Sequence, residues 1–399
     1  MAAAAPRPHR EEDVATRSVC ALLLAISTAP ALADPSPVSV TTSVERHHTS
    51  NALDSSFAVP DWYTLMRGSL QHQWQHETGY VRLGAEAEAS RYDTISIEND
   101  RAAVLQLEAT GKTSPELELR GALTYRISSQ GDDLPIATLI LGTRTKKQVF
   151  AAETQIGIDL GGGTALVLEL ADAYEKIGAA RFQQSLLAPA KLDPDRNRLV
   201  VGARLVRSVG PLAYGVSAST TSVAVEELGF PPVGLSLSQY ALRLEGAWTD
   251  ADAGSLNSAI GFEMLRGAEG IYEDIRPTYR VAFAKPLPNG FELRGALFAR
   301  FETADSDDPL ASWLRRGEIE ARLRVSDQLL LASGLFGESK DNLLLENQER
   351  AHGAYAEASY DATRTMALVV RVDFTDRFLT VLDERRKTLD AFVGIRTKL

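Results

Sequence analysis

The sequence has little cysteine, few aromatic residues and no long apolar run. Its single cysteine among 399 residues is Cys20, near the N-terminus, so the rest of the chain can form neither an intramolecular disulfide nor a cysteine-ligated zinc site. No apolar run approaches the roughly 18 residues that a transmembrane helix needs. The formal net charge is −11 with no long basic tract to offset it, which argues against nucleic acid as a partner. These absences leave a large soluble protein or a chain that crosses a membrane with strands.

The N-terminal segment indicates export. Arg17 precedes the short apolar run "SVCALLLAISTAPALA", which ends in the small-x-small pattern Ala31-Leu32-Ala33 before Asp34, the pattern that signal peptidase reads. We therefore expect residues 1–33 to be a cleaved signal peptide and residues 34–399 to form the mature protein. A buried N-terminal helix is the alternative.

Apolar and charged residues alternate through most of the chain. In "NGFELRGALFARFE", residues 289–302, one side of an extended strand carries Phe291, Leu293, Gly295, Leu297, Ala299 and Phe301. The other side carries Glu292, Arg294, Ala296, Phe298, Arg300 and Glu302. Because successive side chains of a strand point to opposite faces, the segment predicts a strand with one apolar and one charged face. The same period of two recurs in "ELELRGALTYRI", "YALRLEGAW", "GEIEARLRV" and "TMALVVRVDF".

Short turns and long polar connections alternate between these segments. This asymmetry is typical of outer-membrane barrels, whose strands are apolar outside and polar inside. We predict an all-β protein: a single transmembrane antiparallel up-and-down β-barrel of about 18 strands, with short periplasmic turns and long extracellular loops. The expected strands are 38–49, 64–75, 80–90, 100–110, 116–128, 147–160, 164–174, 198–208, 211–221, 238–248, 255–265, 275–285, 290–302, 313–325, 328–338, 352–360, 364–374 and 388–399.

Two alternatives remain for the fold. The stretch "PIATLILGTRT" at 135–145 is expected to be a loop hairpin or the top of a neighbouring strand, and a count of about 16 strands is the alternative. A soluble sandwich or multi-sandwich protein also shows alternation of period two. It would need a very large shared core, for which 7% aromatic residues is a small supply.

The C-terminal segment "TLDAFVGIRTKL" resembles the terminal strand of Gram-negative outer-membrane β-barrel proteins. Gly394 lies five residues before the end, as in that pattern, whereas Leu399 stands where a terminal Phe or Tyr is usual. Thr397 replaces a second common aromatic residue. The resemblance implies an outer-membrane location, contact with outer-membrane lipid and lipopolysaccharide, and insertion by the barrel-assembly machinery. It identifies no porin subfamily and no oligomeric state.

The expected lumen is rich in charges of both signs. The candidate pore-lining residues are Arg120, Arg126, Arg243, Arg280, Arg294, Arg300, Arg322, Arg324, Arg371, Glu118, Glu245, Glu292, Glu318 and Glu320. Arginine binds carboxylate and phosphate in a planar, bidentate way, so inward arginines could form a ladder for an anionic solute or polysaccharide. The plainer interpretation is that Arg and Glu pair with each other and solvate the lumen.

Catalysis and cofactor binding are not indicated. None of the histidines lies in a recognisable nucleophile motif. His72 and His76 could share a face and hold a metal, but interfacial polar residues are the plainer interpretation, so we expect no metal and no cofactor. The "GIDLGGG" stretch lacks the Lys-Ser/Thr of a phosphate loop and predicts a turn.

Three functions are left open by the sequence. The first is a porin-like channel or exporter for hydrophilic solutes, with anionic solutes and polysaccharides as the narrower class. The second is a non-transporting outer-membrane barrel, such as a surface adhesin, receptor or assembly scaffold. An outer-membrane hydrolase is the third.

Overall fold

The computed structural model describes residues 38–399 apart from 56–57, 137–138, 184–186, 227, 229–234, 251–252, 271, 304–309, 346 and 381–382. The expected signal peptide, residues 1–33, lies outside the described residues. Within those residues the chain is almost entirely β-strand. No helix among the described residues is long and apolar enough to span a membrane.

Eighteen long strands form one closed antiparallel barrel. They are β1 (Val38–Thr49), β2 (Asp61–His76), β3 (Gly79–Tyr92), β4 (Arg101–Ser114), β5 (Leu117–Ile136), β6 (Leu139–Gly161), β7 (Thr164–Ile177), β9 (Arg196–Val209), β10 (Leu212–Val225), β11 (Leu237–Asp250), β12 (Gly254–Gly267), β13 (Glu273–Leu287), β14 (Phe291–Glu302), β15 (Ser312–Arg324), β16 (Leu329–Asn342), β17 (Gln348–Asp361), β18 (Met366–Leu379) and β19 (Glu384–Lys398). A short strand, β8 (Arg181–Phe182), pairs with the start of β6.

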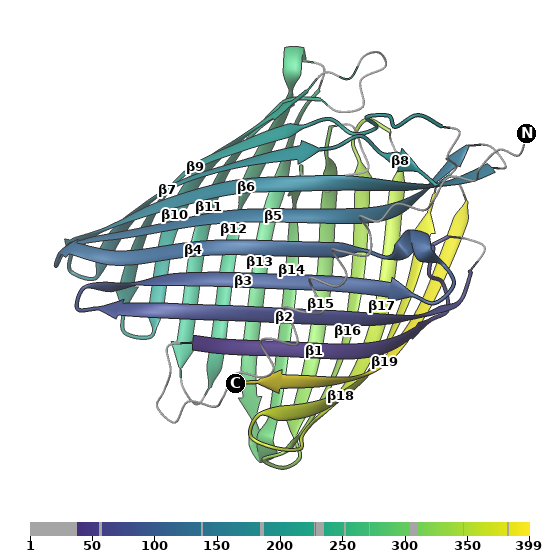
Figure 1. The fold of residues 1–399 in the computed structure, drawn as a ribbon. Coiled ribbons are helices and arrows are strands. Elements are labelled where there is room, and N and C mark those ends of the chain that lie inside the picture. The colour runs from purple at the N-terminus through teal and green to yellow at the C-terminus, as the bar shows by residue number, and fades with distance from the viewer. Residues whose placement is uncertain are drawn as a thin grey trace, which may run out of the picture.

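Each long strand pairs with the next along the chain, and the last pairs with the first. The closing ladder runs from Thr41↔Lys398 to Thr49↔Asp390 between β1 and β19. Figure 1 shows β1 lying beside β19, and the strands of the near wall crossing in front of the strands of the far wall. Closure leaves no open sheet edge, so the backbone groups of the ring pair within it, as a strand-built membrane protein requires.

The predicted strands are confirmed, and the count is 18 rather than 16. The stretch 135–145 is the top of β5 and β6, whose pairing continues to Ile136↔Leu139. What the sequence presents as a long connection is therefore mostly an extended hairpin.

Short turns gather at one end of the barrel, which we call the short-turn end. The predicted turn at Gly161, Gly162 and Gly163 is confirmed, with φ of 82°, 61° and 77°, values that glycine adopts without a steric penalty. Val38 and Lys398 lie at the same end, as the pairing of β1 with β19 requires. The opposite, long-loop end carries the connections after β1, β3, β7, β10 and β14.

The predicted alternation of faces is confirmed for most of β14. The expectation that Phe301 faces lipid with the other outward residues is wrong. Leu297 is 50% exposed on the outer face, whereas Phe301, on the same side of the strand, is only 4% exposed. The ladder between β13 and β14 ends at Tyr279↔Ala299. Beyond that pair β14 bends toward the interior, so its outer side packs on the inner wall instead of facing lipid.

Candidate pore lining and its pocket

The two faces of the barrel wall differ in chemistry. One face carries exposed apolar side chains, such as Leu244 and Phe262 at 70% and 63% exposure. On the other face, side chains reach across an intervening strand: the Tyr63 hydroxyl on β2 donates to Asp390 Oδ2 on β19 at 3.0 Å. Side chains converge in this way on the concave side of a curved sheet, so the polar face is the lumenal one.

The structure places every candidate pore-lining residue on this lumenal face. On β14 and β15, Arg294 lies opposite Glu320 and Glu292 opposite Arg322. The remaining candidates alternate with outward residues along their strands in the same way. They are Arg300, Glu318 and Arg324 on β14 and β15, and Arg120, Arg126, Glu118, Arg243, Glu245, Arg280 and Arg371 on other strands.

Many lumenal ion pairs join residues two positions apart on one strand. Glu292 and Arg294 approach to 3.0 Å, Arg316 and Glu318 to 3.2 Å, and Glu320 pairs with Arg322. Residues at i and i+2 lie on the same face of a strand, which allows these contacts. Glu292 and Arg294 on β14 lie opposite Arg322 and Glu320 on β15, so acids and bases alternate over these four positions of the wall. This part of the lumen is close to neutral.

Three further candidate arginines are neutralised by acids on neighbouring strands. Arg120 lies 2.8 Å from Glu108, Arg243 pairs with the fully buried Glu263, and Arg371 contacts Glu357 at 3.3 Å. Arg371 also binds Asp373 on its own strand at 2.7 Å. These contacts match the plainer interpretation of the charged lumen.

Four candidate arginines have no ion pair with any residue that the structure describes. They are Arg126, Arg280, Arg300 and Arg324. Two of them, Arg280 and Arg300, border the same pocket in the wall formed by β9 to β15. The Arg300 guanidinium carbon lies 5.4 Å from the centre of the Phe298 ring, and Phe298 is the register partner of Arg280.

This lumenal pocket has a volume of about 720 Å³. Its floor consists of small inward residues, among them Gly215, Ala247, Ala259 and Ala296. Small side chains leave a hollow where larger ones would fill the space in front of the wall.

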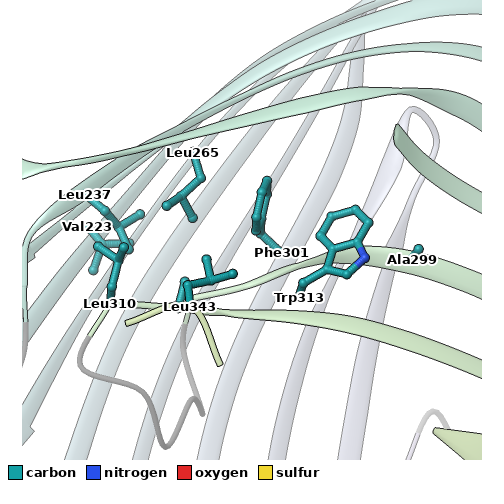
Figure 2. Packing of buried hydrophobic residues seen from close by; sticks show 9 residues of the cluster. Val223, Leu237, Leu265, Ala299, Phe301, Leu310, Trp313 and Leu343 are labelled. Carbon is teal, nitrogen blue, oxygen red and sulfur yellow. The ribbon is translucent and has the colours of Figure 1, made fainter. Parts of the chain in front are cut away.

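An apolar cluster lies beside the pocket at the long-loop end (Figure 2). Val223, Leu237 and Leu265 come from the inner face of β10 to β12, and Phe301 and Trp313 come from the ends of β14 and β15. We call these five residues, with Ala299, Leu310, Ala311 and Leu343, the mouth cluster.

Polar contacts hold the inward bend that forms the mouth cluster. Thr278 Oγ1 donates to the Ala299 carbonyl oxygen at 2.8 Å. The Phe301 amide donates to Glu263 Oε2 on β12 at 3.0 Å, across the intervening strand β13. Arg276 lies 5.4 Å from the centre of the Trp313 ring. The ends of β14 and β15 therefore narrow the mouth of the barrel.

Sequence reasoning also missed a polar network at the seam between β1 and β19. His47 Nδ1 lies 2.8 Å from Asp390 Oδ1, and its Nε2 lies 3.2 Å from Glu45 Oε2. The His47 ring stacks on Tyr63, with centroids 4.4 Å apart. Alternation does place Glu45, His47 and Asp390 on inward faces. Nothing local in the sequence shows that residues separated by 343 positions meet.

The histidine pair considered for a metal does not gather further ligands. His72 lies on the outer face, opposite Leu83, and its ring contacts Trp74 edge-on with centroids 4.1 Å apart. Among the residues that the structure describes, no group of three or more His, Cys, Asp or Glu side chains could hold a metal ion.

No known protein-family model matches the sequence, and no curated protein matches it. Solved structures do match. The chain is similar to the copper transporter OprC, with a TM-score of 0.53 at 10% identity over 91% of this chain and 80% of that one. It is also similar to the FrpB iron transporter from Neisseria meningitidis (F5-1 variant), with a TM-score of 0.50 at 8% identity over 90% and 82% of the two chains.

At these identities the likeness establishes the fold. The chain has the fold of the outer-membrane β-barrel proteins, without assignment to a subfamily. Both of these neighbours are described as transporters.

Proposed function

We propose that the protein is an outer-membrane channel, porin-like or an exporter, that passes hydrophilic solutes through its charged lumen. One observation carries the proposal: the closed ring is apolar on its outer face and charged on its inner face. Barrels of 18 strands in this class leave an interior wide enough for an aqueous channel. The transport activities of the similar structures support the same class of function.

The proposed orientation places the short turns in the periplasm and the long loops outside the cell. The expected signal peptide would deliver the chain to the periplasm, and the barrel-assembly machinery would insert it by way of β19. The outward residues Val393, Ile395 and Leu399, all about half exposed, would then contact lipid and lipopolysaccharide. The test is fractionation: the protein should enter the outer-membrane fraction as a band whose gel mobility changes on heating. Recovery of untagged protein in the soluble periplasm would contradict it.

Planar-bilayer recording tests the channel directly. Folded, purified protein should give discrete conductance steps, and the same preparation unfolded by heat should give none. A folded barrel, verified by its unheated gel mobility, that inserts into the bilayer without conductance would contradict the proposal.

A non-transporting barrel is the second candidate function. The observation in its favour is the inward bend of β14 and β15, which narrows the mouth. A surface receptor, adhesin or scaffold would keep this arrangement permanently and would not conduct. The same recording therefore separates the two candidates.

A further inference from the structure

The wall opposite the seam contains a pocket whose charges are not balanced. Four arginines border it, Arg204, Arg243, Arg280 and Arg300, against three acids. Glu245 lies 3.6 Å from Arg204, and Glu263 pairs with Arg243.

The third acid does not neutralise the remaining arginines. Glu318 is held by Arg316, which lies 3.2 Å away and outside the pocket. Arg280 and Arg300 therefore face the pocket without a carboxylate from any described residue, and two positive charges remain uncompensated at this place in the lumen.

We propose that this pocket binds a small organic anion, with its carboxylate on Arg280 and Arg300 and a compact apolar body against the wall. Both arginines neighbour Phe298: Arg280 is its register partner on β13, and the Arg300 guanidinium lies over its ring. A planar guanidinium binds a carboxylate in a bidentate way, whereas a hydrated inorganic ion needs no apolar surface.

The remaining lining provides that apolar surface. Val206, Ala259 and Ala296 lie on the floor, and Ala299 joins the pocket to the mouth cluster. The volume of about 720 Å³ is within the usual range for small-molecule sites. The inference rests on the proposed function, because the solute would reach the pocket through the lumen.

Benzoate, benzamide and acetate are the probes. Each is titrated into the folded full-length protein in detergent, and binding is followed by NMR of the ligand. Benzoate should bind, whereas benzamide, which has the ring without the charge, should not bind measurably. Acetate has the charge without the ring and should bind about tenfold more weakly, because it buries less apolar surface.

The double variant R280Q/R300Q should weaken benzoate binding by at least about tenfold, since each lost contact is a charge-assisted hydrogen bond. The matched control is R126Q/R324Q, which removes the same charge from two arginines that also have no ion pair among described residues but lie outside this pocket. It should leave benzoate affinity unchanged. The unheated gel mobility of each variant shows whether the barrel is folded. Should R280Q/R300Q not fold, the single variant Arg300→Lys, which keeps the charge but not the planar fork, should weaken benzoate binding.

Several results would overturn the inference. Equal losses of benzoate affinity in the two double variants would mean that the positive potential of the whole lumen, and not this pocket, attracts the anion. Equal binding of benzoate and benzamide, or unchanged benzoate affinity in R280Q/R300Q, would exclude recognition by these arginines. The proposed channel function is tested separately. A folded wild-type barrel that binds benzoate through Arg280 and Arg300 but never conducts would support the binding site and contradict the channel function.

Discussion

At the scale of single residues, several lumenal arginines are neutralised by an acid two positions away on the same strand. Arg294 and Arg322 appear in the sequence as candidates for an anion ladder, yet each has an acid beside it on its own strand. Arg280 and Arg300 form no such pair with a described residue. The sequence "TYRVA", residues 278–282, has Thr278 and Ala282 at i±2 of Arg280 and so no carboxylate there. A search for inward arginines without such an acid would have found Arg280, but Arg300 has Glu302 two positions away. Only the structure shows that Glu302 instead pairs with Lys340, at 3.2 Å.

The faces of β14 give a prediction about stability. Leu297 lies on the outer face and is half exposed, so Leu297→Arg should lower the free energy of unfolding by roughly 2–4 kcal/mol in a lipid bilayer. Ala296→Arg should cost much less, because Ala296 faces the lumen opposite Glu318. The measurement is reversible unfolding in urea from lipid vesicles. Equal losses at the two positions would contradict the assigned faces.

At the scale of strands, alternation predicts where each strand lies in the sequence and which side chains face outward. It does not predict the path of β14 beyond the end of its ladder with β13. Every predicted strand lies within a strand of the structure or overlaps it. The pattern also assigns Phe301 to lipid, because period two continues without a break to Glu302. The inward bend depends instead on the contact of the Phe301 amide with Glu263, which is 38 positions away in sequence. Such long-range contacts are not visible in a local pattern.

The mouth cluster gives a prediction about conductance. Trp313→Ser removes the ring that packs against Phe301, with centroids 4.8 Å apart, and that lies beside Arg276. With less apolar surface buried, the ends of β14 and β15 should separate from the inner wall. Single-channel conductance should rise or become noisier. The control is Trp248→Ser, on the outer face of β11 near the short-turn end, which should leave conductance unchanged. Identical traces for wild type and Trp313→Ser would show that the bend does not limit flow.

The segment before β9 gives a prediction about pH, outside the barrel wall. Asp195 accepts a hydrogen bond from the Ile177 amide at 2.8 Å, and Lys191 lies 3.0 Å from Asp195 and also pairs with Glu226. Burial alone would raise the pKa of Asp195, but the Ile177 amide and Lys191 outweigh it, so this pKa is lowered from its usual 3.8. The Lys191 contact and the Asp195 amide lower the pKa of Glu226 from its usual 4.5.

A lowered carboxyl pKa stabilises the folded arrangement above the usual pKa, and that stabilisation is lost as the pH falls through the lowered value. The exchange protection of the Ile177 amide, corrected for intrinsic rates, should therefore be constant at neutral pH and fall below about pH 4. The neighbouring Gly178 amide binds the Lys146 carbonyl oxygen at 2.8 Å, with no carboxylate involved, and should keep its protection. Parallel loss at both amides would indicate general unfolding and contradict the local assignment.

At the scale of the whole molecule, the sequence predicts that the barrel is closed only through the even number of its expected strands. An even strand count with both ends on one side requires β1 to meet β19, and the structure confirms it. The side chains that stabilise the seam could not be predicted. Asp390 accepts from the Tyr63 hydroxyl and contacts His47, so one carboxylate joins β2, β1 and β19.

Asp390→Ala should therefore weaken the closed ring. The change leaves the largely buried His47 ring and the Tyr63 hydroxyl without their shared partner, and an unsatisfied buried polar group costs about 1–3 kcal/mol. Asp373→Ala is the control: Asp373 is the register partner of Asp390 on β18, and its partner Arg371 keeps Glu357 at 3.3 Å. The measurement is the temperature at which the folded gel band converts to the unfolded one. It should fall clearly more for Asp390→Ala, because only that carboxylate bridges the first and last strands. Equal shifts in the two variants would mean that backbone pairing alone holds the seam.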